Sequence, residues 1–300
     1  MKIRICSINI SSQPGFSRQA VDEAYITAEG IIGDTRGGRN QGQISLLSKK
    51  SISPLAPGSC GENLTIEGID PYGFSLLDHL KIGEVELEII RIPRTGSISN
   101  DICKKEEAES ILPHRGIFAR VISGGKLRKG EEIIHIPRLL KIMVLTVSDR
   151  AFTGEYEDRS GPHILTFLRK HFAPTTWKLN LSSRIIPDDV QMIRSILTDS
   201  ILKETDIIFT TGGTGIGPKD YTVDTVLHIS DRIVPGVMDS IRIKYGSDNP
   251  NALLSRSVCA LKGETIIYTL PGSTRAVDEY LREIIKTMEH MILMLHGIGH

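Results

Sequence analysis

The chain has 300 residues, with 36 Lys and Arg against 36 Asp and Glu, so its formal net charge is zero. Nucleic-acid binders usually carry a basic excess, and acidic disordered chains carry the opposite excess with few apolar residues, so the balance argues against both classes. With 40% hydrophobic and 24% charged residues, the composition is typical of a globular protein of roughly two domains.

The sequence also argues against a membrane protein. No apolar run reaches the roughly 18 residues that a transmembrane helix needs, and Met1–Ile10 lacks the apolar core and cleavage site of a signal peptide. The cysteines stand far apart and form no CxxC pair, which gives a structural zinc site no local support. We therefore expect a cytoplasmic protein with free thiols at Cys6, Cys60, Cys103 and Cys259.

The first part of the chain, residues 1–138, consists of short β-prone segments separated by Gly, Pro and Ser. This pattern favours a β-rich barrel or sandwich. The best helical pattern within it is Lys104–Ile111. The predicted strands are Ile3–Ile10, Gln43–Leu47, Val85–Ile92, Ile117–Ile122 and Ile133–Ile136.

In residues 139–300, strands and helices alternate. Such alternation predicts a three-layer α/β domain in which a mostly parallel sheet carries helices on both faces. The predicted strands are Ile142–Val147, Trp177–Ile186, Asp206–Thr211 and the hairpin Ser257–Leu261 with Thr265–Leu270. The predicted helices are Pro162–Phe172, Asp188–Lys203, Val223–Ser230, Val237–Tyr245 and Thr274–Leu295.

Ligands of open parallel sheets bind beyond the carboxyl ends of the strands, and polar loop residues follow several of the predicted strands. The Gly212–Gly217 loop is the sharpest signal, because glycines permit positive φ and expose N–H groups that can wrap an oxyanion. Thr211 and Thr214 add hydroxyl donors. The pattern is neither a Walker loop nor a GxGxxG that opens a helix, so a glycine turn without a ligand is the alternative.

Asp188 and Asp220 are the candidate catalytic carboxylates. Each opens a predicted helix, so each is either a helix N-cap or a ligand. Two carboxylates beside a phosphate-type loop favour Mg²⁺, which binds carboxylates together with substrate phosphates. If Asp188 is a ligand, Asp189 is left to cap the helix. Arg256 is either a phosphate clamp or a surface residue.

Seven motifs in residues 140–296 occur in the order found in one family. They are Ser148-Asp149-Arg150, Glu157-Asp158-Arg159-Ser160-Gly161-Pro162, Ile186-Pro187-Asp188, Thr210-Thr211-Gly212-Gly213-Thr214-Gly215, Lys219-Asp220-Tyr221-Thr222, Leu254-Ser255-Arg256 and Leu270-Pro271-Gly272. Together they resemble the molybdopterin-binding fold of molybdopterin adenylyltransferases in molybdenum cofactor biosynthesis. The resemblance implies that ATP adenylylates the terminal phosphate of molybdopterin, that pyrophosphate is released, and that Mg²⁺ is required.

The resemblance places the essential, metal-binding aspartates at Asp188 and Asp220. The turn Pro271–Thr274 is closer to a related bacterial paralogue, because adenylyltransferases more often have Asn or Gln after the Pro-Gly pair. The predicted substrate-binding residues are Ser148, Asp149, Arg150, Gly161, Thr211, Gly212, Gly213, Thr214, Gly215, Ser255, Arg256, Pro271, Gly272 and Ser273.

The first domain resembles the MOSC family (molybdenum cofactor sulfurase C-terminal domain). The matching stretches are Glu29–Asp34, Gln43–Leu47, Pro57-Gly58, Gly61–Thr65 and Arg115–Val121. The resemblance implies a β-rich barrel that binds the molybdenum cofactor. Many members carry a cysteine in the loop that here reads Pro93–Ser97 without a thiol, so we expect cofactor holding rather than persulfide chemistry. Asn63 and Arg115 are either anion contacts or structural residues.

The leading hypothesis is therefore a bifunctional protein. The second domain adenylylates molybdopterin with Mg²⁺ and ATP, and the first binds the cofactor or hands it on. The alternative is a non-enzymatic protein that stores or delivers molybdopterin. The resemblance also implies a homo-oligomer, a trimer through the second domain, and partners among the molybdenum insertion machinery or molybdoenzymes. We expect neither nucleic acid nor a membrane as a partner.

Overall fold

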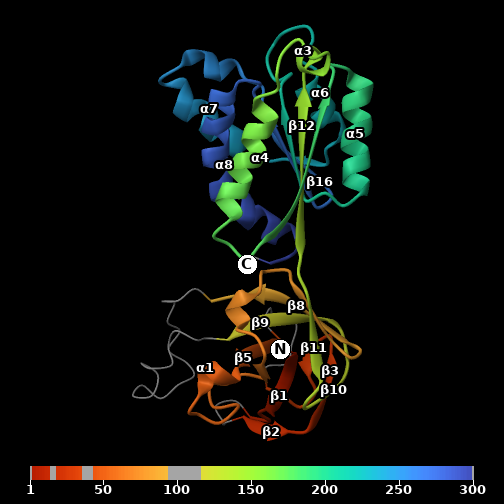
Figure 1. Cartoon of the computed structure of the whole chain (residues 1–300), viewed down its shortest axis with the longest axis vertical. Coiled ribbons are helices and arrows are strands. Elements are labelled where there is room, and N and C mark those ends of the chain that lie inside the picture. The colour runs from red at the N-terminus through yellow and green to blue at the C-terminus, as the bar shows by residue number, and fades with distance from the viewer. Residues whose placement is uncertain (1, 14–17, 36–42, 94–115, 299–300) are drawn as a thin grey trace. The chain divides into compact units, whose positions relative to one another are not determined.

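The structure is a computed structural model that describes residues 2–13, 18–35, 43–93 and 116–298. The chain divides into two compact units, Met1–Arg138 and Leu139–His300, which Figure 1 draws in red to yellow and in yellow-green to blue. The predicted helix Lys104–Ile111, Cys103, Arg115 and most of the loop after Pro93 lie outside the described residues.

The first unit contains a closed barrel of seven strands in the order β11-β7-β8-β9-β5-β6-β1, with β11 paired back to β1. In the strand pair that closes the barrel, Ile3 of β1 lies opposite Ile133 of β11. Closure removes the exposed sheet edges, and it confirms the barrel among the alternatives that the sequence left open. The strands are β1 (Ile3–Ile10), β5 (Ile44–Ser48), β6 (Leu64–Glu67), β7 (His79–Ile82), β8 (Val85–Arg91), β9 (Ile117–Ser123) and β11 (Glu132–Ile136).

Smaller elements surround the barrel. Strand β2 (Gln19–Val21) extends the sheet beside β1, and β10 (Gly125–Arg128), β3 (Glu23–Thr27) and β4 (Gly30–Ile31) form a separate three-stranded sheet. The helical elements are the short helix α1 (Lys49–Ile52) and the 3-10 turn η1 (Pro71–Gly73). Isoleucine and leucine side chains from every barrel strand fill the interior, and Ile8, Leu64 and Leu87 are completely buried.

The second unit is built on one six-stranded sheet in the order β13-β12-β14-β17-β16-β15. The first four strands run parallel, and the last two are antiparallel to their neighbours. The strands are β12 (Leu139–Val147), β13 (Lys178–Ile186), β14 (Ile207–Thr211), β15 (Arg232–Ile233), β16 (Cys259–Lys262) and β17 (Thr265–Leu270).

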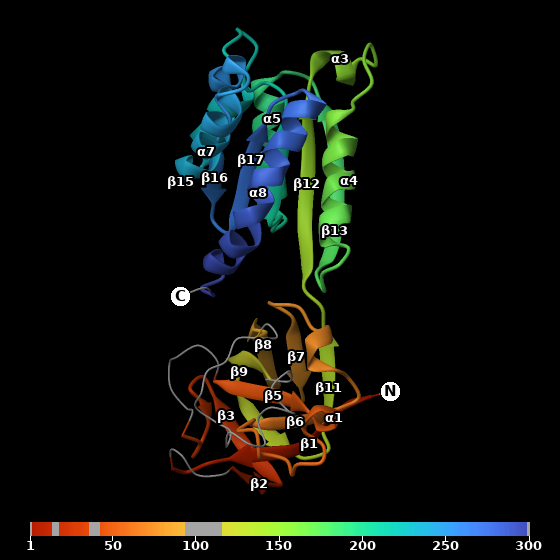
Figure 2. The ribbon, with the colours of Figure 1, turned by 90° about the vertical axis from the view of Figure 1, so that its left-hand side faces the viewer.

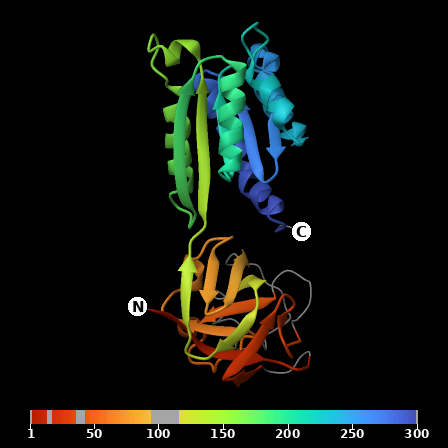
Figure 3. The same ribbon diagram turned by 90° about the vertical axis from the view of Figure 1, so that its right-hand side faces the viewer.

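Helices cover both faces of this sheet, as the alternating pattern predicts. In Figure 2, α4 and α8 lie on the face toward the viewer, and in Figure 3 α5 lies on the opposite face. The helices are α3 (Asp149–Phe152), α4 (Ser160–Phe172), α5 (Val190–Leu202), α6 (Thr222–Ile229), α7 (Pro235–Gly246) and α8 (Thr274–Leu295), with the 3-10 segment η2 (Pro250–Leu254). Among the helices that the structure describes, none combines the length and the apolar composition needed to cross a bilayer.

The topology creates a switch point at the carboxyl end of β12. From β12 the chain moves to β13 on one side, and β14 then pairs with β12 on the other side. Loops that leave β12 and β14 in opposite directions open a crevice between them, and ligands of open α/β sheets bind in such crevices. Val147 and Thr211 are the last residues of these two strands.

Candidate functional site

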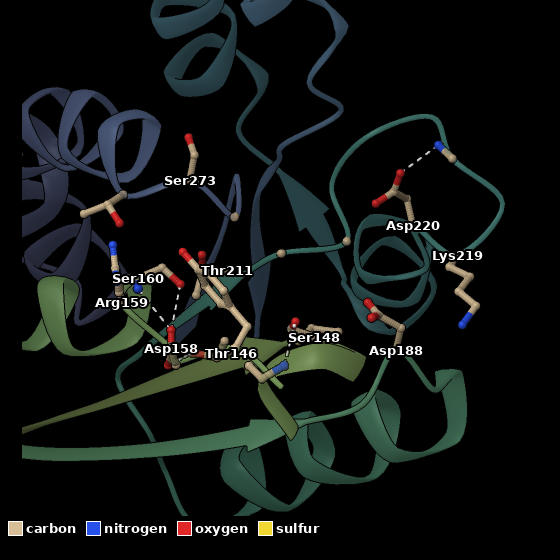
Figure 4. A pocket seen from close by; sticks show the side chains of 18 of the residues that line it. Thr146, Ser148, Asp158, Arg159, Ser160, Asp188, Thr211, Lys219, Asp220 and Ser273 are labelled. Carbon is tan, nitrogen blue, oxygen red and sulfur yellow. Dashed lines mark hydrogen bonds between the residues drawn. The ribbon is translucent and has the colours of Figure 1, made fainter. Parts of the chain in front are cut away.

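A pocket of about 610 Å³ lies at this switch point. Figure 4 shows Asp188, Lys219 and Asp220 at one end, and Asp158, Arg159 and Ser160 toward the other. The lining comes from the carboxyl ends of β12, β13, β14 and β17 and from the first residues of α4 and α8. The lining residues are Thr146, Val147, Ser148, Ala151, Tyr156, Asp158, Arg159, Ser160, Asp188, Thr211, Gly212, Gly213, Gly217, Pro218, Lys219, Asp220, Gly272, Ser273 and Thr274.

Asp188 follows β13 and is not a helix cap. The N-cap of α5 is Asp189, whose side chain accepts a hydrogen bond from the Met192 N–H at 2.7 Å. Asp188 instead accepts from the Asp149 N–H through Oδ2 at 2.9 Å. Its other oxygen, Oδ1, accepts from no described residue. The capping alternative is therefore wrong for Asp188, and its carboxylate lines the pocket.

Asp220 is not a cap either. The N-cap position of α6 belongs to Tyr221, which makes no side-chain capping bond. Asp220 Oδ2 accepts from the Gly217 N–H at 2.7 Å, so the carboxylate holds the turn between Gly217 and Asp220 closed. A Cβ on Gly215 would stand 2.8 Å from this oxygen, and one on Gly217 would stand 2.9 Å from it. Glycines at both positions are needed for the loop to wrap this closely around the carboxylate.

Asp149 links three of the loops around the pocket without lining it. Its Oδ1 accepts from the Asp188 N–H at 3.0 Å, and its Oδ2 accepts from Lys219 Nζ at 2.7 Å. The Lys219 hydrogen bond, followed by that from the Asp188 backbone, lowers the pKa of Asp149 below its ordinary value. The same pairing raises the pKa of Lys219, so the pair is ionised at neutral pH.

The glycine loop after β14 has the backbone geometry that anion binding requires. Gly212 and Gly213 have φ of 98° and 62°, in the left-handed region that favours glycine. A Cβ would lie 2.2 Å from the Val147 carbonyl oxygen at Gly212 and 2.4 Å from Thr222 Oγ1 at Gly213. The N–H groups of Gly213, Thr214 and Gly215 donate to no other described residue. Bare N–H groups in such a loop are suited to phosphate oxygens.

The N-terminus of α8 brings a second set of N–H groups to the same pocket. Ser273 is its N-cap and accepts from the Ala276 N–H at 3.3 Å. The N–H groups of Ser273 and Thr274 donate to no other described residue, and both residues line the pocket. The dipole of this 22-residue helix adds positive potential where anions bind.

The hydroxyl of Thr211 differs from the prediction. The sequence suggested a donor to the ligand, but Thr211 Oγ1 donates to the Pro271 carbonyl oxygen at 2.8 Å. It therefore ties the loop after β14 to the loop after β17. Thr214 is buried, and its carbonyl oxygen accepts from the Arg256 N–H at 2.9 Å.

Of the sixteen site residues predicted in the second unit, eight line the pocket and eight do not. Those that line it are Ser148, Asp188, Thr211, Gly212, Gly213, Asp220, Gly272 and Ser273. Those outside the lining are Asp149, Arg150, Gly161, Thr214, Gly215, Ser255, Arg256 and Pro271.

Arg256 and its neighbour Ser255 are engaged elsewhere. The Arg256 guanidinium pairs with Asp224 of α6, and Ser255 Oγ lies 2.9 Å from Ser257 Oγ. The hydrogen bond that Arg256 donates to Asp224 raises the pKa of Arg256. These contacts favour the surface alternative for Arg256 over a phosphate clamp.

Asp158 is a lining residue to which the sequence analysis gave no role. Its Oδ1 accepts from the N–H groups of Ser160 and Gly161, each at 3.0 Å, and its Oδ2 accepts from Thr146 Oγ1 at 2.7 Å. It thus fastens the first turn of α4 to β12. A Cβ at Gly161 would meet Asp158 Oδ2 at 2.5 Å, so Gly161 acts by close packing. The position of Asp158 shortly before a predicted helix was the feature of the sequence that could have indicated this role, because Asp is favoured at helix N-termini.

Cations also lie at the rim near Tyr156. The Arg150 and Arg159 guanidinium carbons stand 5.1 Å and 5.9 Å from the centre of the Tyr156 ring. Tyr156 and Arg159 line the pocket, and Arg150 does not. Lys219 lines the other end of the pocket, beside Asp188 and Asp220.

The two carboxylates fit Mg²⁺. Asp188 and Asp220 each have one oxygen engaged by a backbone N–H and one that accepts from no described residue. Among the described residues there is no group of three or more His, Cys, Asp and Glu placed as metal ligands. Mg²⁺ is typically held by one or two carboxylates, with substrate phosphates and water completing the shell. A metal here would therefore depend on a phosphorylated ligand.

In the first unit, Asn63 is held entirely by the barrel. It is completely buried, its Oδ1 accepts from the Ser45 N–H at 3.1 Å, and its Nδ2 donates to Asp34 Oδ2 at 3.0 Å. Asp34 in turn pairs with Arg18 Nη1 at 2.5 Å. These contacts favour the structural alternative for Asn63. Arg115, the other candidate there, lies outside the described residues.

The second unit is thus an α/β domain that brings a glycine loop, a helix N-terminus and two carboxylates together around one pocket. The family described as "Probable molybdopterin binding domain" matches residues 143–290. A molybdopterin adenylyltransferase of Haemophilus influenzae is 34% identical over 52% of this chain and 78% of its own length. The chain therefore belongs to this family.

Two further proteins show the extent of the similarity. A molybdopterin adenylyltransferase of Escherichia coli K12 is 32% identical over 53% of this chain and 80% of its own length. The solved structure of the molybdopterin biosynthesis Mog protein from Mycobacterium ulcerans is 29% identical, covers 53% of this chain and 99% of its own, and has a TM-score of 0.49. The residues matched by the family lie within the second unit.

Proposed function

We propose that the second unit is a molybdopterin adenylyltransferase of molybdenum cofactor biosynthesis. The observation that carries the proposal is that Asp188 and Asp220 line one pocket together with the glycine loop, whose N–H groups are bare. The chain is also related to enzymes of that name. ATP and molybdopterin are the substrates. A phosphate oxygen of molybdopterin attacks the α-phosphorus of ATP, the bond to the β-phosphate oxygen breaks, and pyrophosphate leaves with the electron pair.

The chain acts mainly by positioning. The N–H groups of Gly213, Thr214 and Gly215 cradle one phosphate, and the N-terminus of α8 orients a second anionic group. Asp188 and Asp220 hold Mg²⁺, which when bound neutralises charge on the phosphate oxygens. Lys219 lines the same end of the pocket and pairs with Asp149, so it helps to hold the loops that carry these carboxylates in place.

Pyrophosphate release tests the proposal. The full chain is incubated with molybdopterin, Mg²⁺ and ATP, and release is compared between wild type, Asp188→Ala and Asp189→Asn. We expect Asp188→Ala to lower the rate at least about 100-fold, because it removes charge stabilisation at the reacting phosphate. Asp189→Asn keeps the cap of α5 and should retain the rate. Tight molybdopterin binding without pyrophosphate would instead establish the storage or delivery alternative.

We further propose that the first unit is a MOSC-like barrel that binds the molybdenum cofactor or hands it on. Its closed barrel is in keeping with the β-rich class that the resemblance implies. The test is retention of molybdenum cofactor by the full chain after the glycine loop of the second unit is disabled by Gly213→Val, since a Cβ there would stand 2.4 Å from Thr222 Oγ1. Loss of all cofactor binding in that variant would contradict a second site.

The resemblance of the second unit to the molybdopterin adenylyltransferases leads us to propose a homo-oligomer, with a trimer through this unit as the expected state. Light scattering of the full chain measures it: the mass should be close to three times that of a 33.1 kDa chain. A monomer at micromolar concentration would contradict this expectation.

A further inference from the structure

We propose that Asp149 is a positioning residue for the metal-binding carboxylate. Together with Lys219, it holds Asp188 in the orientation that leaves one oxygen available to a divalent cation, and it makes that orientation depend on the glycine loop. The inference rests on the proposed function only in taking Asp188 as a metal ligand. Asp149 itself does not line the pocket, so it acts through Asp188.

The first observation is a reciprocal pair of hydrogen bonds between two strand ends. The Asp149 N–H donates to Asp188 Oδ2 at 2.9 Å, and the Asp188 N–H donates to Asp149 Oδ1 at 3.0 Å. Each carboxylate is thus oriented by the backbone of the other residue. The Asp149 N–H holds the Asp188 side chain, and the Asp149 carboxylate holds the Asp188 backbone, so both parts of Asp188 are tied to the residue that follows β12. Loss of the Asp149 carboxylate would free the Asp188 backbone and thereby let its side chain move.

The second observation is that the remaining oxygen of Asp149 is held from a third loop. Lys219 Nζ donates to Asp149 Oδ2 at 2.7 Å, and Lys219 lies next to Asp220 in the loop that follows β14. The Asp149 carboxylate therefore joins the loops after β12, β13 and β14. A displacement of Lys219 releases one side of Asp149 and loosens Asp188 without any direct contact between Lys219 and Asp188.

The charges explain why such a residue is needed. Asp188 and Asp220 line the same end of the pocket, and like charges there repel until a cation is bound. The Lys219 ammonium offsets Asp149, so the positioning carboxylate adds no net charge to that end. Outer-shell partners of this kind typically change metal affinity by 10–100-fold when they are removed.

The same local chemistry occurs elsewhere in the unit without a role in the pocket. Asp231 Oδ1 accepts from Lys262 Nζ at 2.7 Å, and its Oδ2 accepts from the Gly263 N–H at 2.9 Å. Asp231 therefore matches Asp149 in having one lysine and one backbone partner, but that backbone partner is not a metal-binding residue. Asp231→Ala is the matched control for Asp149→Ala.

The test is binding of Mn²⁺ in the presence of ATP, measured on the full chain by electron paramagnetic resonance of the free ion. Mn²⁺ accepts the same oxygen ligands as Mg²⁺. We expect Asp149→Ala to weaken Mn²⁺ binding by about 10–100-fold and Asp231→Ala to leave it unchanged. Asp149→Asn retains an oxygen that accepts from the Asp188 N–H, so it should recover most of the affinity lost in Asp149→Ala. The Mn²⁺ affinity of Lys219→Met should lie between the affinities of Asp149→Ala and Asp149→Asn.

Turnover gives an independent readout. If the chain releases pyrophosphate, Asp149→Ala should raise the Mg²⁺ concentration for half-maximal rate about 10-fold or more, and excess Mg²⁺ should restore most of the maximal rate. A purely structural role would instead lower the maximal rate without moving the Mg²⁺ dependence. Circular dichroism confirms that each variant is folded before these measurements are compared.

The outcomes separate this inference from the proposed function. Wild-type Mn²⁺ affinity in a folded Asp149→Ala variant overturns the inference, even if pyrophosphate release proves the enzyme. Equal losses in Asp149→Ala and Asp231→Ala also overturn it, because the effect would then be general. Absence of pyrophosphate release, together with a specific loss of Mn²⁺ binding in Asp149→Ala, defeats the proposed function and supports the inference.

Discussion

Gly215 packs so closely against Asp220 that a Cβ on the glycine would stand 2.8 Å from the Asp220 Oδ2 atom. That oxygen already accepts the Gly217 N–H at 2.7 Å, so the carboxylate has no free direction in which to yield. The backbone φ of Gly215 is not in the left-handed region, and the constraint on this glycine is therefore space rather than conformation.

Substitution of Gly215 should impair the activity of the site while leaving the fold intact. Gly215→Ala should displace the Asp220 carboxylate and lower pyrophosphate release by at least about 10-fold, since misplacing a reacting group by about 1 Å can cost 100-fold. The loss of thermal stability should be small, because the displaced group borders the pocket. Gly236→Ala in α7 is the control: nothing lies within 4 Å of its Cβ, and alanine suits a helix. Unchanged activity in Gly215→Ala would contradict the role given to Asp220.

The sequence predicted the second unit closely because its signals are local and strong. Helix α8 occurs at Thr274–Leu295, the predicted bounds, since an apolar face from Val277 to Ile292 repeats with helical periodicity after a Ser273 cap. Strand β12 contains the nearly continuous apolar run Ile142–Val147, which the polar residue Ser148 follows. The sequence placed Asp188 and Asp220 at neighbouring strand ends, but they follow β13 and β14, which lie on either side of β12.

Interactions between distant residues could not be predicted in the same way. The ring formed by Asp149 and Asp188 joins residues 39 positions apart, and Lys219 lies 70 positions from Asp149. Nothing in the local pattern states which of several polar loop residues will face the ligand and which will bind one another. The sequence therefore grouped Asp149 with the substrate contacts, although it does not line the pocket.

Several short strands of the first unit escaped prediction for a related reason. Strands β6 and β7 of the barrel and strands β3 and β10 of the smaller sheet have four or five residues each, and Glu23 of β3 and Lys81 of β7 are exposed. So few residues give a weak alternation, and pairing with the neighbouring strands supplies the stability that local propensity lacks. The longer strands β1, β8 and β9 were predicted to within two residues of their ends.

A buried ion pair in the barrel should control the stability of the first unit. The side chains of Arg18 and Asp34 are 5% and 1% exposed and lie 2.5 Å apart. Asp34→Ala leaves the guanidinium buried without its counterion, which typically costs about 3–5 kcal/mol. Glu132→Ala, which removes an exposed partner of Lys2, is the control and should cost under about 1 kcal/mol.

Denaturant unfolding checks this prediction with two probes. Far-ultraviolet circular dichroism reports both units, whereas Trp177, the single tryptophan of the chain, lies in the second unit, where its Nε1 donates to Glu289 at 3.0 Å. Asp34→Ala should shift the transition of the barrel and leave the tryptophan transition in place. A circular dichroism transition identical to wild type would contradict the role of the pair.

The pair also predicts how the barrel responds to acid. Burial, the largest influence, raises the pKa of Asp34, but hydrogen bonds from Arg18, the Ser11 N–H and Asn63, together with the Arg18 charge, outweigh it and lower the pKa below its ordinary value. The resulting stability is present above the unfolded pKa of about 3.9 and is lost as pH falls through the lower folded pKa. Asp34→Ala should therefore flatten the acid limb of the barrel's stability profile.

His79 should give the barrel a second pH dependence, of opposite sign. A hydrogen bond to Glu88 raises the pKa of His79; burial opposes this, and a further hydrogen bond to Glu86 adds to the rise. Because the folded pKa exceeds the unfolded value of about 6.5, the stabilisation is complete below that pH and is lost as pH rises through the folded pKa. Relative to His79→Gln, the wild-type barrel should lose stability above pH of about 6.5. Parallel profiles for the two proteins would contradict this.

Thiol reactivity offers the last test. Burial raises the pKa of Cys259 to about 12. Burial, followed by a hydrogen bond from the thiol to Glu67 and by the charge of that carboxylate, raises the pKa of Cys6 to about 11. Since the thiolate is the nucleophile, at pH 8 only about 0.1% of Cys6 and less of Cys259 should be reactive. Iodoacetamide with mass spectrometry should find both unmodified in the native protein and alkylated in urea. Glu67→Gln should speed alkylation of Cys6 and leave Cys259 unchanged, and equal rates at Cys6 with and without Glu67 would show that its charge has no influence there.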